Sequence, residues 1–292
     1  MPSLKDIRTR IKSVKTTQQT TKAMKMVSAS KLRRAQDLII NLRPYAGKLK
    51  GLMQHVAKEG DVESPYVSSR PANQVLLVVV SSSRGLCGGF NNNLFKIVNL
   101  AIQEQYAEHA ASGRLRLLCV GKKSYDYYRK RGYTLVGDQH DVFAKLNFDQ
   151  VNDVAKRVME GFVAEEWDHV DLFYNQFKNI ATQVRTQEPF LPVQTDIVGA
   201  ADAGANDFIF EPDKATIVTE LIPRILKMQF YRAVLESNAS EQGARMIAMD
   251  NATENAEDLL HQLKLTFNKA RQASITKEIL EIVGGAEALS SS

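Results

Sequence analysis

The chain has 292 residues, of which 44% are apolar and 24% are charged, and its formal net charge is +5. This composition is ordinary for a globular protein and excludes collagen-like, low-complexity and disordered chains. The longest uninterrupted apolar run, Val75 to Val80, is far shorter than the roughly 20 residues that span a bilayer, so we expect membrane association only through a partner.

The first predicted element is a long basic helix from Leu4 to about Lys58. Apolar residues from Leu4 to Val14 recur at steps of three and four, which is typical of a coiled-coil seam. The polar stretch TTQQTTK interrupts this seam, which resumes at Met24. Such a helix would be about 80 Å long at 1.5 Å per residue, so it needs a partner along its length.

Positive charge is concentrated in this first segment. Residues 1–60 contain fourteen Lys and Arg against three acidic residues, a net charge of +11 that leaves −6 for the rest of the chain. A basic segment on a near-neutral body favours an acidic partner, which could be nucleic acid, anionic lipid or acidic protein loops. The opening MPSLKDIRTRIK has no apolar signal region, and we therefore expect a cytoplasmic protein.

From about Gln74 to Val198 the pattern changes to alternating strands and helices. QVLLVVVSS is typical of a buried parallel strand, and helical and strand-like segments then alternate. This alternation predicts an α/β sandwich with a mostly parallel sheet. The predicted strands are QVLLVVVSS, RLRLLCVG, YTLVGD, HVDLFYNQF and QVRTQEPFLPVQ.

After the small, flexible stretch GAADAGAN, a helix is predicted from a cap at Asp213 almost to the end of the chain. Its heptad pattern runs from Ala256 to Ser274, and a second phase of Ile275, Ile279, Ile282 and Ala286 continues the seam. Pro223 is predicted to kink this helix or to mark a break between two helices.

These elements together predict an α/β fold in which the two terminal helices form a long antiparallel coiled coil beside a Rossmann-like α/β foot. The expected domains are residues 1–60 and 207–288 for the two shaft helices and 70–200 for the α/β domain.

Two glycine patterns resemble phosphate-binding turns but match neither nucleotide motif. SSSRGLCGGF follows the first strand, and Gly121-Lys122-Lys123-Ser124 lacks the first Gly of a P-loop because Arg116 stands there. A tight strand-to-helix turn explains the first pattern better than nucleotide binding. No catalytic set, metal-ligand spacing or cofactor motif can be assembled, and two cysteines do not make a disulfide framework.

Several stretches resemble the gamma subunit family of F-type ATP synthases, in the family's order and over essentially the whole chain. They are IRTRIKSVKTTQQTTKAMKMVSASKLRRAQ, VVSSSRGLCGGFNNNLF, NASEQGARMIAMDNATENA and LTFNKARQASITKEILEIVGGAEAL. Ser83 stands where the family usually has Asp, Asp250 where a Lys is common, and Pro223 is unexpected.

The resemblance implies a non-catalytic rotor shaft, present in one copy, that couples proton flow through a membrane c-ring to the alpha and beta subunits. Its location would be the cytoplasmic face of the inner membrane, and it would hold no cofactor and no metal. The residues implied to contact a beta subunit are Met24, Lys25, Arg245, Arg271, Gln272 and Thr276. Those implied to lie in the foot, against the rotor ring and the epsilon subunit, are Arg84, Gly85, Cys87, Phe208, Phe210 and Glu211.

Two other function classes stay open from the residues alone. A small-molecule enzyme with coiled-coil arms requires a site that the sequence does not reveal. A nucleic-acid-binding coiled coil requires strongly salt-dependent affinity, and the basic helix has no aromatic residue before Tyr45 for base stacking.

Overall fold

A computed structural model describes residues 3–58, 64–67, 70–137, 146–193 and 214–290. The chain divides into two compact units: residues 28–245, which hold the sheet, and residues 1–27 with 246–292. Two helices, α1 (Leu4–Lys58) and α6 (Lys214–Ser290), contribute to both units. Each unit is described below by itself.

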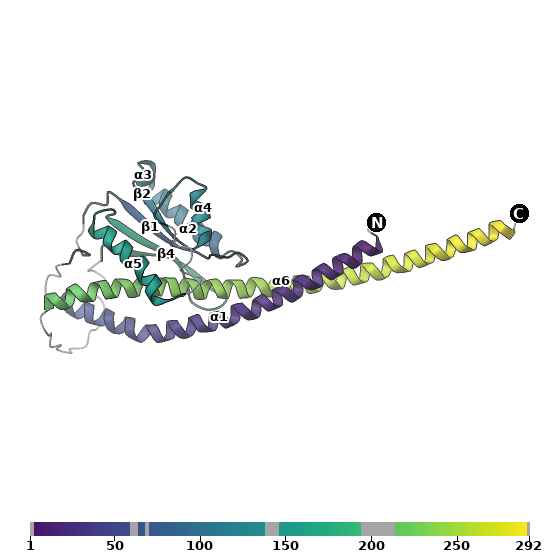
Figure 1. Cartoon of the computed structure of the whole chain (residues 1–292), viewed down its shortest axis with the longest axis horizontal. Helices are drawn as coiled ribbons and strands as arrows, with labels where there is room; N and C mark the ends of the chain where they lie inside the picture. Colours follow the sequence, from purple (N-terminus) through teal and green to yellow (C-terminus); the bar gives the residue numbers. More distant parts are fainter. Residues whose placement is uncertain (1–2, 59–63, 68–69, 138–145, 194–213, 291–292) are drawn as a thin grey trace. The chain divides into compact units, whose positions relative to one another are not determined.

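The unit of residues 28–245 is built on a five-stranded sheet (Figure 1). The strand order is β3-β2-β1-β4-β5, with β1 (Val75–Val80), β2 (Leu115–Val120), β3 (Thr134–Leu135) and β4 (His169–Phe177) parallel. The edge strand β5 (Gln183–Leu191) pairs antiparallel to β4. β1 is buried along its whole length, as expected for a central strand of a sheet covered on both faces.

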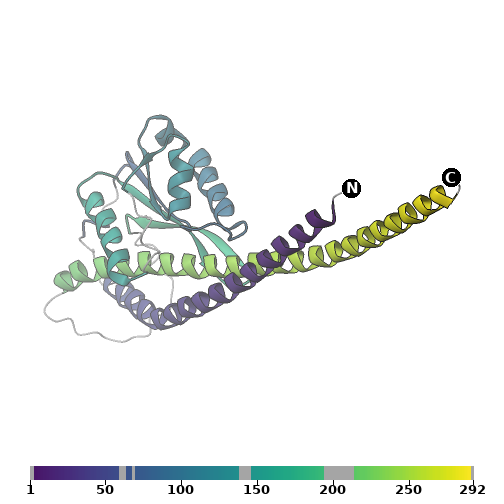
Figure 2. The same cartoon turned by 45° about the vertical axis from the view of Figure 1, so that its right-hand side comes forward.

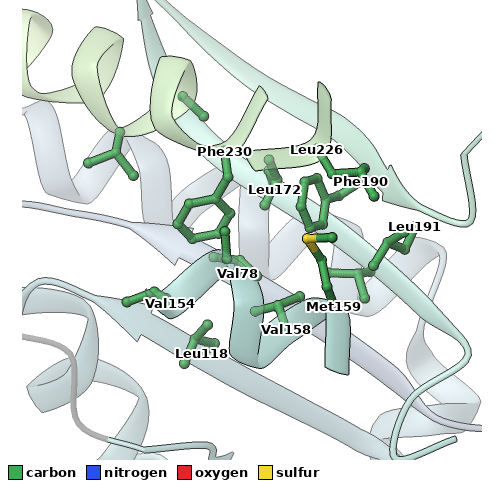
Figure 3. Close-up of a cluster of buried hydrophobic side chains, with 14 of the residues drawn as sticks. Val78, Leu118, Val154, Val158, Met159, Leu172, Phe190, Leu191, Leu226 and Phe230 are labelled. Atoms are coloured by element: carbon green, nitrogen blue, oxygen red, sulfur yellow. The ribbon is translucent and has the colours of Figure 1, made fainter. Parts of the chain in front are cut away.

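Helices cover both faces of this sheet. One face packs against α2 (Phe90–Glu104), α4 (Lys122–Arg129) and the single turn α3 (Ala107–Ala111). The other face packs against α5 (Phe148–Val163) and α6. Figure 3 shows Phe230 and Leu226 of α6 meeting Val158 and Met159 of α5 over this second face. The stretch of α6 from Leu221 to Val234 therefore contributes to the core of the α/β unit.

Within the same unit, α1 packs against α6 through a small apolar cluster of Leu32, Ala35, Ile39, Leu235 and Ala239. The α1 residues of this cluster are three and four positions apart, which is coiled-coil spacing. The α6 helix therefore contacts the sheet and α1 at once in this unit.

The second unit is a pair of helices, α1 up to Val27 and α6 from Met246 (Figure 2). The two helices run antiparallel, since Arg8 lies over the Phe267 ring while Thr21 contacts Thr253. The Thr21 and Thr253 hydroxyl oxygens are 2.8 Å apart. The buried side chains of this pair are Ile7, Thr21, Met249, Ala256, Leu260 and Leu263.

The helix pairing differs from the sequence prediction in three ways. The seam does not stop at TTQQTTK, because Thr21 occupies a buried position and bonds its partner helix. Pro223 does not break the chain into two helices; α6 runs through it without interruption. The predicted second phase, Ile275 to Ala286, is exposed rather than part of a seam within the described chain. None of the described helices has a stretch long and apolar enough to cross a membrane.

Candidate functional site

The most unusual surface of the helix-pair unit is the C-terminal end of α6. Every side chain from Arg271 to Ala286 is exposed. Five of these are large and apolar, with exposed fractions from 49% to 67%: Ile275, Ile279, Leu280, Ile282 and Val283. In both Figure 1 and Figure 2 this yellow end of α6 extends past the N-terminal end of α1.

The register of the two helices explains this exposure. Arg8, near the start of α1, lies 5.7 Å from the centroid of the Phe267 ring. Because α1 begins at Leu4, α6 runs out of α1 partners within about one turn after Phe267. The remaining segment, called here the bare end (residues 271–286), would be about 24 Å long. An apolar helix face of this size indicates a binding surface for another molecule.

Arg271, Gln272 and Thr276, the sequence-predicted contact residues of this region, are exposed and lie at the start of the bare end. Their neighbour Lys277 forms an ion pair with Glu281 one turn later. The bare end thus presents polar groups and an apolar face together, and no other described side chain covers either.

Met24 and Lys25 lie on α1 in the same unit and are both half-buried. The Lys25 ammonium forms an ion pair with the carboxylate of Asp250 on α6. The sequence departure at Asp250 therefore has a structural explanation, since the acid pairs with a base on the facing helix.

In the sheet-bearing unit, a rigid turn follows β1. Leu86 at its tip has φ of +64° and is 64% exposed. The Ser82 hydroxyl donates to the Arg84 carbonyl (2.8 Å), and Asn91 of α2 donates to both Ser82 Oγ and Cys87 Sγ. A leucine held at positive φ is uncommon and requires such support from its surroundings.

Arg245 of α6 bonds to the backbone of this turn. Its guanidinium donates to the Arg84 carbonyl (3.2 Å) and to the Gly85 carbonyl (3.3 and 3.4 Å). It also pairs with the Glu241 carboxylate at 2.6 Å, and both side chains are more than nine-tenths buried. Burial raises the pKa of Glu241, although the charge of Arg245 opposes that rise.

This arrangement brings together residues that the sequence places in separate groups. Arg84 and Gly85 are predicted in the foot and Arg245 at a beta-subunit contact, but the three are joined in one hydrogen-bonded site. Glu241 is not predicted at all. Its signal in the sequence is the Glu–Arg spacing of four on one helix, which favours an ion pair.

Cys87 lies inside the turn and is 2% exposed. Burial raises its pKa, with partial opposition from the Ser82 hydrogen bond and the charge of Arg245. Burial likewise raises the pKa of Cys119 to about 12. Both thiols are therefore protonated at neutral pH, and Cys87 accepts the Asn91 hydrogen bond as a neutral thiol.

The serine run Ser81–Ser83 caps α4. Ser124 N donates to Ser81 Oγ (2.9 Å), Lys123 N to the Ser82 carbonyl (3.1 Å) and Lys122 N to Ser83 Oγ (3.5 Å). These are the backbone donors that a bound phosphate would use at a helix N-terminus. Since they already have partners, the Gly121–Ser124 pattern is explained as part of a capped strand-to-helix turn.

Phe208, Phe210 and Glu211, predicted for the foot, lie outside the described residues. Among the residues that the structure describes, no three His, Cys, Asp or Glu side chains gather to hold a metal ion.

Comparison with known proteins agrees with the architecture. The family model described as ATP synthase matches residues 3–289. The chain is 50% identical to the ATP synthase gamma chain of Cytophaga hutchinsonii and 47% identical to that of Chlorobaculum tepidum, with 99% of each chain covered.

Solved structures are similar over most of the chain. A chain from the central stalk and c-ring of the Tetrahymena thermophila mitochondrial ATP synthase is 28% identical, with a TM-score of 0.58 over 80% of this chain and 99% of that one. A chain of the Euglena gracilis mitochondrial enzyme, 22% identical with a TM-score of 0.68 over 98% of this chain and 94% of that one, shows the same fold. On the family model and the two full-length relatives, this chain belongs to the gamma chain family of ATP synthases.

Proposed function

We propose that this gamma chain is the central rotor shaft of an F1Fo ATP synthase and couples proton flow through the membrane ring to catalysis by the alpha and beta subunits. The observation that carries the proposal is the bare end of α6, residues 271–286, where five large apolar side chains are exposed on a stretch of helix that lies beyond the contacts between α6 and α1. A ring of surrounding subunits supplies the cover that this helix lacks.

The physical basis of coupling is asymmetry. A single shaft inside a threefold ring presents a different face to each catalytic site, so each site is biased toward a different conformation. The dependence of site affinity on shaft angle is a coupling free energy between shaft and site. Rotation moves that bias from one site to the next.

Arg271, Gln272 and Thr276 are the residues proposed to contact polar loops of the beta subunits, because all three are exposed at the start of the bare end. Met24 and Lys25 are proposed to meet an acidic segment of a beta subunit. Lys25 would then exchange its carboxylate partner between Asp250 and that segment.

Arg245 is proposed to act indirectly. Because the side chain is buried against Glu241, it does not offer its charge to a partner; it fixes the turn that presents Arg84 and Leu86 at the surface. Gly85 and Cys87 serve the same turn. The foot contacts at Phe208, Phe210 and Glu211 are proposed from family resemblance alone.

The chain is proposed to be non-catalytic and to bind no cofactor, with catalysis in the beta subunits. It would be held at the cytoplasmic face of the inner membrane, in one copy per complex, through the epsilon subunit and the c-ring. The division into shaft helices, residues 1–60 and 207–288, and a foot of residues 70–200 is part of the same proposal.

Purification of the tagged full chain from detergent-solubilised membranes tests this function. We expect recovery of alpha, beta and epsilon subunits and the c-ring with ATPase activity. Recovery of the chain without alpha and beta subunits would contradict the proposal. The same purification with a Lys156→Gln chain, which is changed on the exposed face of α5, should recover the same subunits.

A further inference from the structure

The α4 helix and the two residues that follow it carry a cluster of cations that the coupling function leaves without a role. Five basic residues lie within ten positions, and all five are exposed: Lys122, Lys123, Arg129, Lys130 and Arg131. We call them the α4 surface. Asp126 is the single acidic residue in the same stretch, so the segment has a local net charge of +4.

These cations are not neutralised within the part of the chain that the structure describes. None of them takes part in any ion pair between described residues. Arg129, Lys130 and Arg131 are at the helix C-terminus, where the helix dipole favours positive charge. Lys122 and Lys123 are at the N-terminus, where the dipole opposes it.

The arrangement of Arg131 indicates a surface prepared for a carboxylate. Its guanidinium lies 3.5 Å from the centroid of the Tyr127 ring, and its Nη1 donates to the Tyr127 carbonyl at 3.1 Å. A stacked guanidinium is already ordered, so less side-chain entropy is lost when its free N–H groups bind. Arginine and tyrosine are also the residues most often found at the centre of protein interfaces.

The same stacking argues against nucleic acid. The Phe95 ring stacks on Tyr127 with centroids 4.4 Å apart and planes at 25°. The Phe95 ring and the Arg131 guanidinium each lie in direct contact with the Tyr127 ring, and they would overlap if they lay on the same side of it. They therefore cover opposite faces of the Tyr127 ring. A single-stranded nucleic acid would need a free aromatic face for base stacking.

The α4 surface is also continuous with the turn after β1. Lys122 N donates to Ser83 Oγ, and a Cβ placed on Gly85 would lie 3.9 Å from Lys123 Cε. The exposed Arg84 belongs to the same turn. The positive surface thus runs from the turn that Arg245 supports along the length of α4, about 12 Å of helix.

We propose that the α4 surface docks an acidic segment of another protein subunit of the ATP synthase. The segment would present carboxylates to Lys122 and Lys123 at one end of α4 and to Arg129, Lys130 and Arg131 at the other. Because both groups are exposed, the contact is weak, salt-sensitive and able to exchange as the shaft turns. The inference rests on the proposed rotor function and adds a partner contact to it.

Carbodiimide cross-linking of the purified complex tests this contact, since the reagent joins amines only to carboxylates that touch them. We expect peptides that join Lys122, Lys123 or Lys130 to an Asp or Glu of another subunit. Their yield falls when KCl is raised from about 0.05 M to about 0.5 M, because screening shortens the reach of exposed charges. The intrachain Lys25–Asp250 product is the positive control, and Lys156 should join only Glu160.

The outcomes separate the two proposals. If the complex contains alpha and beta subunits and Lys25 is cross-linked to Asp250, but none of the three α4 lysines joins another subunit, the docking inference is wrong and the rotor function stands. If alpha and beta subunits are absent, the rotor function itself fails.

A membrane is the competing partner. The test is sedimentation of the full chain with vesicles of phosphatidylglycerol and phosphatidylcholine. If the chain sediments with the vesicles, the Lys122→Gln/Lys123→Gln/Lys130→Gln variant does not, and the Lys156→Gln variant still does, the surface binds lipid and the inference is overturned. No difference between the variants in sedimentation, with the cross-links present in the complex, supports the protein partner.

Discussion

Asp250 of α6 accepts a hydrogen bond from the Lys25 ammonium of α1, so an ion pair joins the two helices of the terminal pair. An exposed pair of this kind contributes only about 0.2–1 kcal/mol. The pair contributes more to the choice of which face of α1 lies against α6 than to the free energy of unfolding.

Reversal of this pair is the first prediction. Asp250→Lys alone places two cations together and should lower the free energy of unfolding by up to about 1 kcal/mol. Lys25→Glu combined with Asp250→Lys should restore it. Urea denaturation of the full chain measures both effects, and a double variant no more stable than the Asp250→Lys variant would show that the pair does not interact.

The second prediction concerns the buried Arg245–Glu241 pair. Arg245→Met should cost about 3 kcal/mol, because Glu241 and the Arg84 and Gly85 carbonyls then lose a buried donor. Adding Glu241→Leu should recover much of that loss, since no buried charge then lacks a partner. Denaturant unfolding of the two variants gives the comparison; equal stability of both would contradict the assignment.

The third prediction is a pH dependence at Asp171, which is 3% exposed. Burial raises the pKa of this carboxyl. Hydrogen bonds from His169, Tyr106 and Gln187, together with the charge of His169, lower it by more than burial raises it, so the net shift is downward from 3.8. The unfolded chain therefore binds a proton more readily than the folded one. Stability from this group is complete above about pH 4 and is lost as the pH falls through the lower folded pKa.

Asp171→Asn tests this sign. The variant should be less stable than the parent at pH 7, by about 1–3 kcal/mol, because three polar groups lose their anionic acceptor. The difference between the two proteins should shrink as the pH falls below about 4. A difference that stays constant from pH 7 to pH 3 would assign the effect to packing instead.

The fourth prediction separates binding from stability at the bare end. Ile275→Asp, Ile279→Asp and Ile282→Asp together should leave the unfolding of the isolated chain within about 0.5 kcal/mol of the parent, since all three side chains are about half exposed or more. The same changes should reduce ATP-driven proton pumping of the assembled complex. Lys277→Ala with Glu281→Ala, on the polar face, is the control and should have a smaller effect.

The fifth prediction uses two helical glycines. A Cβ on Gly161 of α5 would overlap the Trp167 ring, which is buried and donates its indole N–H to the Val158 carbonyl. Gly161→Ala should therefore cost about 1–3 kcal/mol. Gly47→Ala in α1 meets no other atom within 4 Å and should stabilise the chain by about 0.5–1 kcal/mol, because Gly lowers helix stability. Thermal unfolding compares the two.

Periodicity predicts the elements well where a single pattern dominates. β4 has the predicted bounds, His169–Phe177, and β1 lies inside the predicted QVLLVVVSS. The antiparallel edge strand β5 does not follow from such patterns, because strand direction depends on the connection and not on side-chain alternation. Of the two alternatives predicted at Pro223, a kink or a break, the break is wrong, because tertiary packing of Ile222 and Leu226 holds the helix on both sides of the proline.

The candidate site is less predictable from sequence than the fold. Exposed residues at the bare end keep the apolar spacing of a seam, so periodicity alone assigns Ile279 and Ile282 to a partner helix within the chain. The contact between Arg245 and Gly85 cannot be predicted from sequence patterns, because the two residues are 160 positions apart. Only the packing of α6 beneath the β1–α2 turn brings them together.

The serine-capped turn after β1 has a wider meaning for the sheet. Open parallel sheets usually keep the crevice at the carboxyl ends of their strands free for a ligand. Here Ser237 donates to the Val80 carbonyl at 3.1 Å, and Arg245 donates to the Arg84 and Gly85 carbonyls. Ser81–Ser83 accept hydrogen bonds from the backbone amides at the start of α4. The polar groups at this end of the sheet are therefore bonded within the chain itself, and their hydrogen bonds hold both α6 and α4 against the carboxyl end of β1.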